Sequence, residues 1–226
     1  MIYINNPPIS HLDLNKFNEM NFILPHLFNE EVYWKYFLTR DLKKYSILDN
    51  SAFELGVSIS DIRLLDYAKK FEVNEIVVPD VWKNKKLTIK RCEDFFKNKK
   101  IKSSYKFMLV PQGEDLIKLK ECLDWMLKFD ALPNRKKVIG LNKSWFNIQQ
   151  IKIGIQLIKD HSYDIEIHKL GCNTLREWFN LKYLPGLRSA DSRIFAKLIS
   201  DKDDPWKSLF TAKEVDLFKK LVKELK

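Results

Sequence analysis

A short apolar run that ends abruptly in polar or small residues recurs along this chain, and this recurrence constrains the fold more than any other feature. In SILDN, for example, Ile47 and Leu48 are followed at once by Asp49 and Asn50. The other runs are MIYIN, NFILPH, EIVVPD, KFMLVPQG, KVIGLNK, DIEIHKLG and LRSADS, which makes eight. Short apolar runs bounded by turn-forming residues are typical of buried strands.

Helix-like segments lie between these runs. The clearest is EDLIKLKECLDWMLKF, which places leucines and Met126 on one face. In SISDIRLLDYAKKF, apolar residues from Ile62 to Ala68 recur at three- and four-residue spacings after Ser60, a suitable N-cap. The remaining helical segments are NIQQIKIGIQLIKDH, NTLREWFNLKYL and TAKEVDLFKKLVKELK. Because strands that alternate with helices indicate parallel βα units, the sequence predicts an α/β protein. We expect a single (β/α)8 TIM-like barrel, as one domain over residues 1–226.

Composition narrows the class of protein. The chain has no long apolar window and no basic-then-apolar leader, so we expect a soluble, cytoplasmic protein with no membrane partner. Cys92, Cys122 and Cys172 are widely spaced and odd in number, which fits free thiols in a reducing compartment. Their spacing argues against a four-ligand zinc site, and no metal or other cofactor is expected.

The net charge of +10 favours a polyanionic partner such as DNA or RNA. A second explanation stays open, because AT-rich coding sequence and solvated helix faces both enrich a chain in lysine. The sequence gives no indication of oligomeric state.

The residues that follow the strands form a candidate site. The carboxyl ends of parallel barrel strands meet at one face, where the ligands of such barrels bind. The residues at these ends are Asp49, Asp80, Gln112, Gly113, Gly140, Leu141, Gly171 and Asp191. Glycine is rare in this chain, and it lets the backbone approach a ligand closely. We therefore predict that these strand ends converge on a common site.

Taken in order, the strand ends resemble the motifs of the tRNA-guanine transglycosylase superfamily. DNSAF resembles the family's D-S-G-G-F motif, VPD its next aspartate, VPQG its Q-G motif and IGLN its G-L motif. HKLG and SADS resemble its L-x-G strand end and its F-D-S nucleophile segment. The resemblance covers about residues 45–195 and implies a barrel enzyme that exchanges bases.

Differences from the family's motifs indicate which of its members this chain resembles. Ser51 and Ala52 stand where the family has two glycines, and neither the C-x-C-x-x-C…H zinc subdomain nor an RNA-binding domain follows Asp191. The chain is therefore similar to the compact phage and bacterial relatives that insert 7-deazaguanine bases into DNA. The resemblance implies a barrel without the zinc subdomain, DNA rather than tRNA as partner, and a 7-deazaguanine base as second substrate.

The resemblance also implies roles for the strand-end residues. Asp191 is expected to attack the anomeric carbon of the target nucleotide and form a covalent glycosyl-enzyme. Asp49 is expected to protonate the leaving guanine and then deprotonate the entering base. Asp80 suits the donors of the guanine edge. The other base-binding residues are expected to be Gln112, Gly113, Gly140, Leu141 and Gly171.

Basic and aromatic residues near the strand ends are candidates for contact with nucleic acid. The expected basic contacts are Lys83, Lys85, Lys86, Lys143 and Arg193. Trp82, Trp145 and Phe146 also follow strand ends, where an aromatic ring can stack on a base, although core packing is the commoner fate of such side chains.

Each of these residues also has a purely structural explanation. Asp49 with Asn50 can form an Asx turn, Asp80 and Asp191 can cap the helices that follow them, and VPQG can be an ordinary turn. His168 lies inside an alternating strand, where we expect a packed barrel residue rather than a catalyst. Glu54 can either cap a helix or contact substrate.

Other functions stay open at this stage. They are guanine exchange in tRNA, a base-excising glycosylase or nucleoside hydrolase in which water resolves the intermediate, and a non-catalytic barrel that binds nucleic acid. Aspartates at three strand ends argue against the last, because a module that binds a polyanion gains nothing from buried negative charge.

Overall fold

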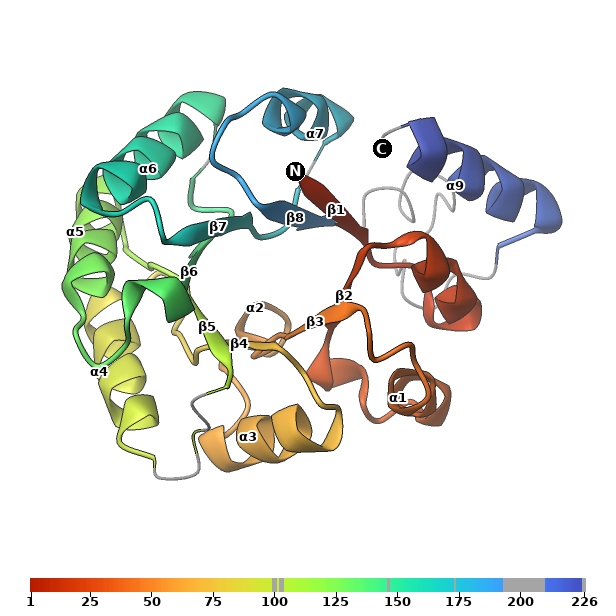
Figure 1. Ribbon diagram of the computed structural model, residues 1–226, viewed down its shortest axis with the longest axis horizontal. Helices are drawn as coiled ribbons and strands as arrows, with labels where there is room; N and C mark the ends of the chain where they lie inside the picture. The colour runs from red at the N-terminus through yellow and green to blue at the C-terminus, as the bar shows by residue number, and fades with distance from the viewer. Residues whose placement is uncertain (99–100, 102–103, 146, 173, 193–209, 225–226) are drawn as a thin grey trace.

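The computed structural model describes residues 1–98, 101, 104–145, 147–172, 174–192 and 210–224. Within this part of the chain, eight parallel strands in the order β1-β8-β7-β6-β5-β4-β3-β2 curl into a nearly closed barrel with helices outside (Figure 1). The strands are β1 (Ile2–Asn5), β2 (Met20–Ile23), β3 (Tyr45–Leu48), β4 (Glu75–Val77), β5 (Lys106–Leu109), β6 (Lys137–Leu141), β7 (Glu166–Lys169) and β8 (Ser189–Ser192). The predicted strands and the (β/α)8 TIM-like barrel are confirmed.

The helices predicted from periodicity are also confirmed. They are α3 (Asp61–Lys70), α5 (Leu116–Lys128), α6 (Ile148–His161), α7 (Leu175–Lys182) and α9 (Ala212–Glu224). Four of them begin at a side chain that accepts a backbone N–H of the first turn, namely Ser60, Asp115, Asn147 and Thr174. Ile62 was expected on the buried apolar face of α3, but it is 58% exposed, and Leu64 is buried in that face instead.

Several helices of the structure were not predicted from the sequence. They are α1 (Glu31–Leu38), α2 (Ala52–Leu55), α4 (Lys85–Phe96) and the 3-10 helices η1 (Ile9–Phe17), η2 (Pro25–Leu27) and η3 (Asn134–Lys136). The buried residues of α4 are Thr88, Cys92 and Phe95, so a polar residue interrupts its apolar periodicity. α4 still lies between β4 and β5, where a parallel βα unit requires a crossover.

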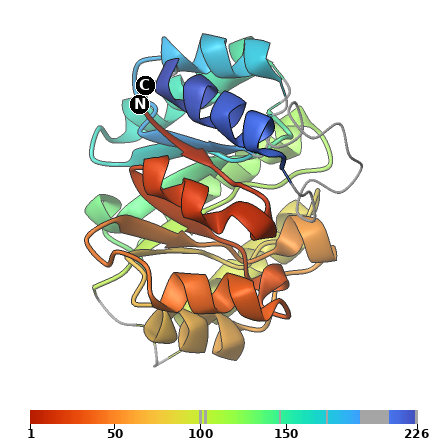
Figure 2. The same cartoon turned by 90° about the vertical axis from the view of Figure 1, so that its right-hand side faces the viewer.

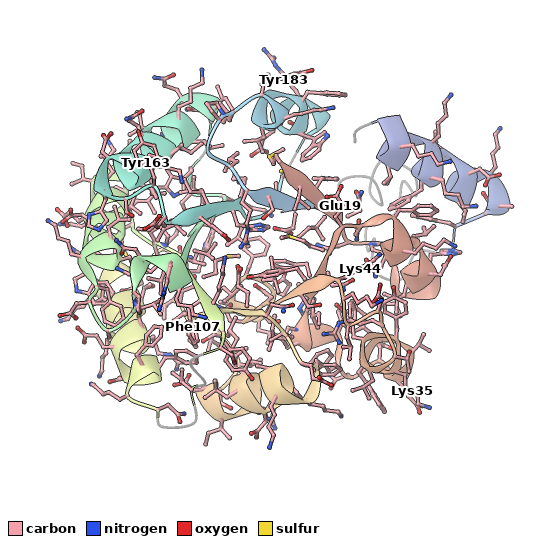
Figure 3. The ribbon with its side chains drawn as sticks, in the orientation of Figure 1. Glu19, Lys35, Lys44, Phe107, Tyr163 and Tyr183 are labelled. Atoms are coloured by element: carbon pink, nitrogen blue, oxygen red, sulfur yellow. The ribbon has the colours of Figure 1, made fainter. Side chains whose placement is uncertain are left out.

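Alternation along each strand divides the side chains between the helices and the barrel interior. Phe107 of β5, labelled in Figure 3, faces outward and contacts the rings of Phe95 and Phe96 of α4, at centroid distances of 6.2 and 5.1 Å. Its neighbour Lys106 points the other way and pairs with Glu166 of β7 across the interior. The same alternation therefore builds both the helix-facing core and the inside of the barrel.

The interior is closed at the amino ends of the strands by a charged plug, which consists of Tyr45, Glu75, Lys106, Glu166 and Arg188. Arg188 Nη1 donates to Glu75 Oε2 at 2.7 Å and to Glu166 Oε2 at 2.5 Å. The Tyr45 hydroxyl also donates to Glu75 Oε2, at 2.7 Å. Because these groups satisfy one another, Glu75 can be fully buried, where an unpaired charge would be costly, while the other members of the plug are partly exposed.

The seam between β1 and β2 is closed by a side chain instead of a strand ladder. Asn18, just before β2, accepts the Asn5 backbone N–H at 3.0 Å and donates to the Asn5 carbonyl at 2.7 Å. Asn18 also donates to Asn15 Oδ1 at 2.9 Å. The Asn18 carboxamide thus satisfies the Asn5 N–H and carbonyl, which point away from β8. On the outside, α9 packs against η1 beside this seam (Figure 2), with the Phe210 N–H donating to His11 Nε2 at 2.9 Å.

Replacing Asn18 with alanine should therefore destabilise the fold. Asn18→Ala leaves the buried N–H and carbonyl of Asn5 without their partner, and we expect the free energy of unfolding to fall by about 2–3 kcal/mol. Urea denaturation followed by circular dichroism measures this change. Asn180→Ala, at an exposed position of α7, is the control and should change stability by less than about 0.5 kcal/mol. Equal stabilities for the two variants would contradict the role of Asn18 in closing the barrel.

Candidate active site

A cavity of about 140 Å³ opens at the carboxyl ends of the strands. The predicted residues Asp49, Asp80, Gln112, Gly171 and Asp191 all line it. Further lining comes from Asn6 after β1, Phe22 and Leu24 of the β2 segment, and Asn142 and Lys143 after β6, so every strand contributes. The volume equals roughly ten water-sized spheres, which is room for one small ligand.

Asp191 of β8 is held by donors from two neighbouring strands. Its Oδ1 accepts the Gly171 backbone N–H at 3.0 Å and lies 3.1 Å from His168 Nε2. Its Oδ2 lies 3.4 Å from Asn6 Nδ2. Gly171 has a φ of +64°, the left-handed conformation that favours glycine, and this turn aims its N–H at the carboxylate. Asp191 is therefore an oriented carboxylate at the edge of the cavity.

Asp49 follows β3 and differs from Asp191 in its surroundings. Its Oδ2 accepts the Ser51 backbone N–H at 2.8 Å, so the Asx turn considered from the sequence is present. Ser51 has a φ of +58° at the position where the resembled family has glycine. Burial, and next the negative charge of Glu54, raise the pKa of Asp49 well above its ordinary value. A raised pKa favours the protonated form of Asp49, which is the form that a general acid needs.

Asp80 is gripped by two side-chain amides. Asn50 Nδ2 donates to its Oδ1 at 2.6 Å, and Gln112 Nε2 donates to its Oδ2. The Gln112 carbonyl in turn accepts the Lys83 backbone N–H at 3.2 Å. The side chain that caps α4 is Asn84, so the sequence-level alternative that Asp80 caps this helix is wrong. Asp80 and Gln112 therefore form one unit in the cavity wall.

The environment of Asp80 changes its acidity. Its side chain is buried, with 5% of the residue exposed. Burial raises the pKa of Asp80 to about 6, although the hydrogen bonds from Asn50 and Gln112 act in the opposite direction. Asp80 is thus a carboxyl group that changes charge near neutral pH.

Three of the predicted base-binding residues do not line the cavity. A side chain on Gly113 would meet the backbone of Leu119 at 2.2 Å, so this glycine permits close packing against α5. A side chain on Gly140 would meet Met108 and Leu170 inside the barrel. Leu141 is fully buried, and it lies against Gly154 of α6, away from the cavity. The contacts found at these three positions are packing contacts.

An aromatic and cationic rim, formed by Phe53, Trp82, Lys83 and Lys143, lies at the cavity mouth. Phe53 and Trp82 line the cavity and meet edge to face, with centroids 5.4 Å apart. Lys143 Nζ lies 4.1 Å from the centroid of the Phe53 ring, and Lys83 Nζ lies 5.9 Å from the Trp82 ring. The lysines suit the anionic part of a ligand, and the aromatic rings suit its aromatic part.

The other candidate contacts lie elsewhere. Lys85 pairs with Glu121 of α5 at 2.5 Å, and Lys86 is exposed on α4; neither lines the cavity. Trp145 is 1% exposed, so it packs in the core. Arg193 and Phe146, and any helix that Asp191 would cap, lie outside the described residues.

His168 was expected to be a packed barrel residue, and it is fully buried in the interior of the barrel. Its ring is nearly parallel to that of Phe22, with centroids 5.7 Å apart. Sequence reasoning did not foresee that it also contacts Asp191. The sequence held a partial signal for this contact. Glu166, His168 and Leu170 alternate along one segment, so all three side chains face the barrel interior.

The acidity of Asp80 gives a prediction for stability. Because its folded-state pKa is about 6 and an ordinary aspartate titrates near 3.8, its contribution to stability is largest below about pH 4 and is lost as the pH rises through about 6. This interval corresponds to roughly 3 kcal/mol. The free energy of unfolding of the wild type, relative to Asp80→Asn, should fall over that range. Urea denaturation at several pH values measures the difference.

Asp66→Asn, at an exposed position of α3, is the control for loss of a surface charge. A stability difference between wild type and Asp80→Asn that stays constant from pH 4.5 to 7.5 would show that Asp80 has no raised pKa.

A scan against protein-family models and a search of curated proteins each gave no match to the chain. Among the described residues, no group of three or more His, Cys, Asp or Glu side chains is placed to hold a metal ion, and no helix has the length and apolarity needed to cross a membrane. The case for a function therefore depends on the fold and on the residues around the cavity.

Proposed function

We propose that this chain is a guanine transglycosylase that exchanges guanine in nucleic acid, most suitably DNA, for a 7-deazaguanine base. The observation that carries the proposal is the pair Asp191 and Asp49, which line one cavity from the ends of β8 and β3 in different environments. Asp191 is oriented by three donors, whereas burial and Glu54 favour a proton on Asp49. Two carboxyl groups with different surroundings suit a nucleophile and a general acid.

The proposed exchange has two steps. An Asp191 oxygen attacks the anomeric carbon of the target nucleotide while the N-glycosidic bond breaks, its electron pair goes to the guanine nitrogen, and Asp49 supplies the proton. The entering base then loses a proton to Asp49, and its nitrogen attacks the anomeric carbon and displaces Asp191. Asp49 returns to its protonated form, so the cycle needs no other reactant.

The Asp80–Gln112 unit supports guanine as the base. Guanine presents an N1–H and an exocyclic amine as donors beside the O6 acceptor. The Asp80 carboxylate has lone pairs beyond those used by Asn50 and Gln112, and the Gln112 amide has a second N–H. A guanine edge can therefore donate to Asp80 and accept from Gln112 at the same time.

The charge distribution supports a nucleic-acid substrate. The rim lysines Lys83 and Lys143 can neutralise phosphates, and Phe53 and Trp82 can stack on a base next to the target. A cavity at the end of a barrel cannot receive a base that stays stacked in a duplex, so the target nucleotide must be turned out of the stack. The combination fits DNA with one extruded or unpaired guanine.

An exchange assay tests the function and separates its competitors. The protein is incubated with duplex DNA, single-stranded DNA, tRNA or a guanosine nucleotide, each with a 7-deazaguanine base, and the nucleosides are then analysed by mass spectrometry. Incorporation into DNA is the expected result. Incorporation into tRNA would identify the tRNA enzyme, and release of guanine without incorporation would identify a glycosylase or hydrolase. Binding without any product would overturn catalysis.

Substitution of the proposed nucleophile should abolish exchange. Asp191→Asn keeps the shape of the side chain and removes the attacking oxygen anion, so we expect the exchange rate to fall by roughly a thousandfold or more while nucleic acid still binds. In Asp49→Asn the attack remains possible, and mass spectrometry of a stalled reaction should show nucleic acid attached to the peptide that contains Asp191. Wild-type exchange by Asp191→Asn would show that another residue is the nucleophile.

The pH dependence of exchange should respond to Glu54. Burial raises the pKa of Asp49 most, and the charge of Glu54 raises it further, so Glu54→Gln should lower that pKa. The general acid must be protonated, so the rate falls as pH rises through this pKa, and the fall should begin at lower pH in the variant. Glu114→Gln, exposed outside the cavity lining, is the matched control. Superimposable pH–rate profiles for wild type and Glu54→Gln would exclude Asp49 as the acid.

A further inference from the structure

A column of polar groups runs up the inside of the barrel, from the charged plug to the cavity. Arg188 Nε donates to Ser189 Oγ at 3.1 Å, and Ser189 Oγ lies 2.8 Å from His168 Nδ1. His168 Nε2 lies 3.1 Å from Asp191 Oδ1. Ser189 and His168 are fully buried. The four residues thus form one continuous hydrogen-bonded chain between the two ends of the barrel.

The first member of this chain is a fixed donor. The guanidinium of Arg188 is bound by Glu75 through both terminal nitrogens, at 2.7 and 3.1 Å, and by Glu166 at 2.5 Å. These carboxylates raise the pKa of Arg188 further above its already high value. An arginine has no acceptor, so at this contact the Ser189 oxygen must accept.

The direction of the remaining hydrogen bonds follows from this start. With one Oγ lone pair used by Arg188, the Ser189 hydroxyl can donate its own hydrogen to His168 Nδ1. Nε2 then carries the imidazole hydrogen and donates it to Asp191, which as a carboxylate can only accept. In this assignment each of the three contacts contains one hydrogen, and the buried Ser189 hydroxyl hydrogen has an acceptor. Stacking against Phe22 holds the ring in the plane that the contacts require.

We propose that His168 is a positioning residue for Asp191, with its tautomer set by Ser189 and Arg188. Oδ1 of Asp191 receives both His168 Nε2 and the Gly171 N–H, whereas the contact to Oδ2 from the described residues is Asn6 at 3.4 Å. Oδ1 is the anchored oxygen, and Oδ2 is the oxygen turned toward substrate. The catalytic role of Asp191 rests on the proposed function, but the hydrogen-bonded chain does not.

Nuclear magnetic resonance tests the chain without any need for turnover. The protein contains four histidines, so the imidazole nitrogens of a 15N-labelled sample can be assigned to His168 by comparison with His168→Phe. We expect hydrogen on Nε2 and none on Nδ1, and a shifted Nδ1 resonance in Ser189→Ala because its hydrogen-bond donor is gone. Hydrogen on Nδ1 in the wild type, or an unchanged Nδ1 resonance in Ser189→Ala, would overturn the proposal.

Kinetics test the effect on Asp191. His168→Phe keeps a planar ring against Phe22 and removes the hydrogen bond to a charged group, so kcat should fall about 10- to 100-fold. Ser189→Ala removes a hydrogen bond between neutral groups, so kcat should fall about 2- to 10-fold, and Ser189→Thr, which keeps the hydroxyl, should restore most of it. KM should change less than about threefold, because substrate contacts are intact.

Ser46→Ala is the matched control. Ser46 is a fully buried serine that bonds to Asn21 and Arg40, away from the column, so its loss should leave kcat unchanged. Wild-type kcat in His168→Phe, or a loss confined to KM, would show that His168 does not position Asp191. Absence of exchange in the wild type would refute the proposed function alone, since the tautomer measurement decides the chain independently.

Discussion

The ion pairs of Arg188 with Glu75 and Glu166 tie together the amino ends of β4, β7 and β8 inside the barrel, and much of the remaining structure depends on them. Glu75 is fully buried, so removing one partner of its pair with Arg188 costs about 3–5 kcal/mol, because the other charge is left unpaired. The pairs also specify register, since a one-residue shift turns every side chain of a strand to the other face. The same parity that puts Glu166 inside puts His168 and Leu170 inside, below and beside the cavity. The plug and the candidate site therefore share one register.

The sequence was sufficient to predict the fold and to predict which residues meet at the centre of the candidate site. The strands could be recognised because each is a short run, either mostly apolar as in EIVVPD or alternating as in DIEIHKLG, that ends in polar or small residues. Because all such strands point the same way, the polar residues at their ends had to meet, and Asp49, Asp80, Gln112 and Asp191 do line one cavity. The local order of residues along the chain was enough to predict this convergence.

What the sequence did not predict depends on contacts between distant segments. Gly113 follows a strand and Gly140 lies next to the end of one, much as Gly171 follows β7, yet they accommodate the α5 backbone and the Met108 side chain. A glycine that permits packing and a glycine that turns an N–H toward a ligand look alike in sequence. The Asn18 closure of the seam and the His168 contact to Asp191 likewise join residues whose pairing requires the closed barrel.

The chain has a net charge of +10, yet several of the side chains that line its cavity are acidic. The carboxyl groups of the cavity are contacted by side-chain amides, by two backbone N–H groups and by an imidazole, which belong to Asn6, Asn50, Gln112, Ser51, Gly171 and His168. Of the described residues that line the cavity, Lys143 alone is cationic, and it sits on the Phe53 ring at the rim. Amide donors orient a carboxylate without neutralising it as an arginine or lysine would, so its oxygens keep their charge for a ligand. An Asp191 carboxylate inside and lysines at the rim fit a substrate that places a neutral, donor-rich ring inside and an anionic backbone outside. A nucleotide within a nucleic acid has this distribution, whereas a free anionic small molecule would bring its charge against the carboxylates.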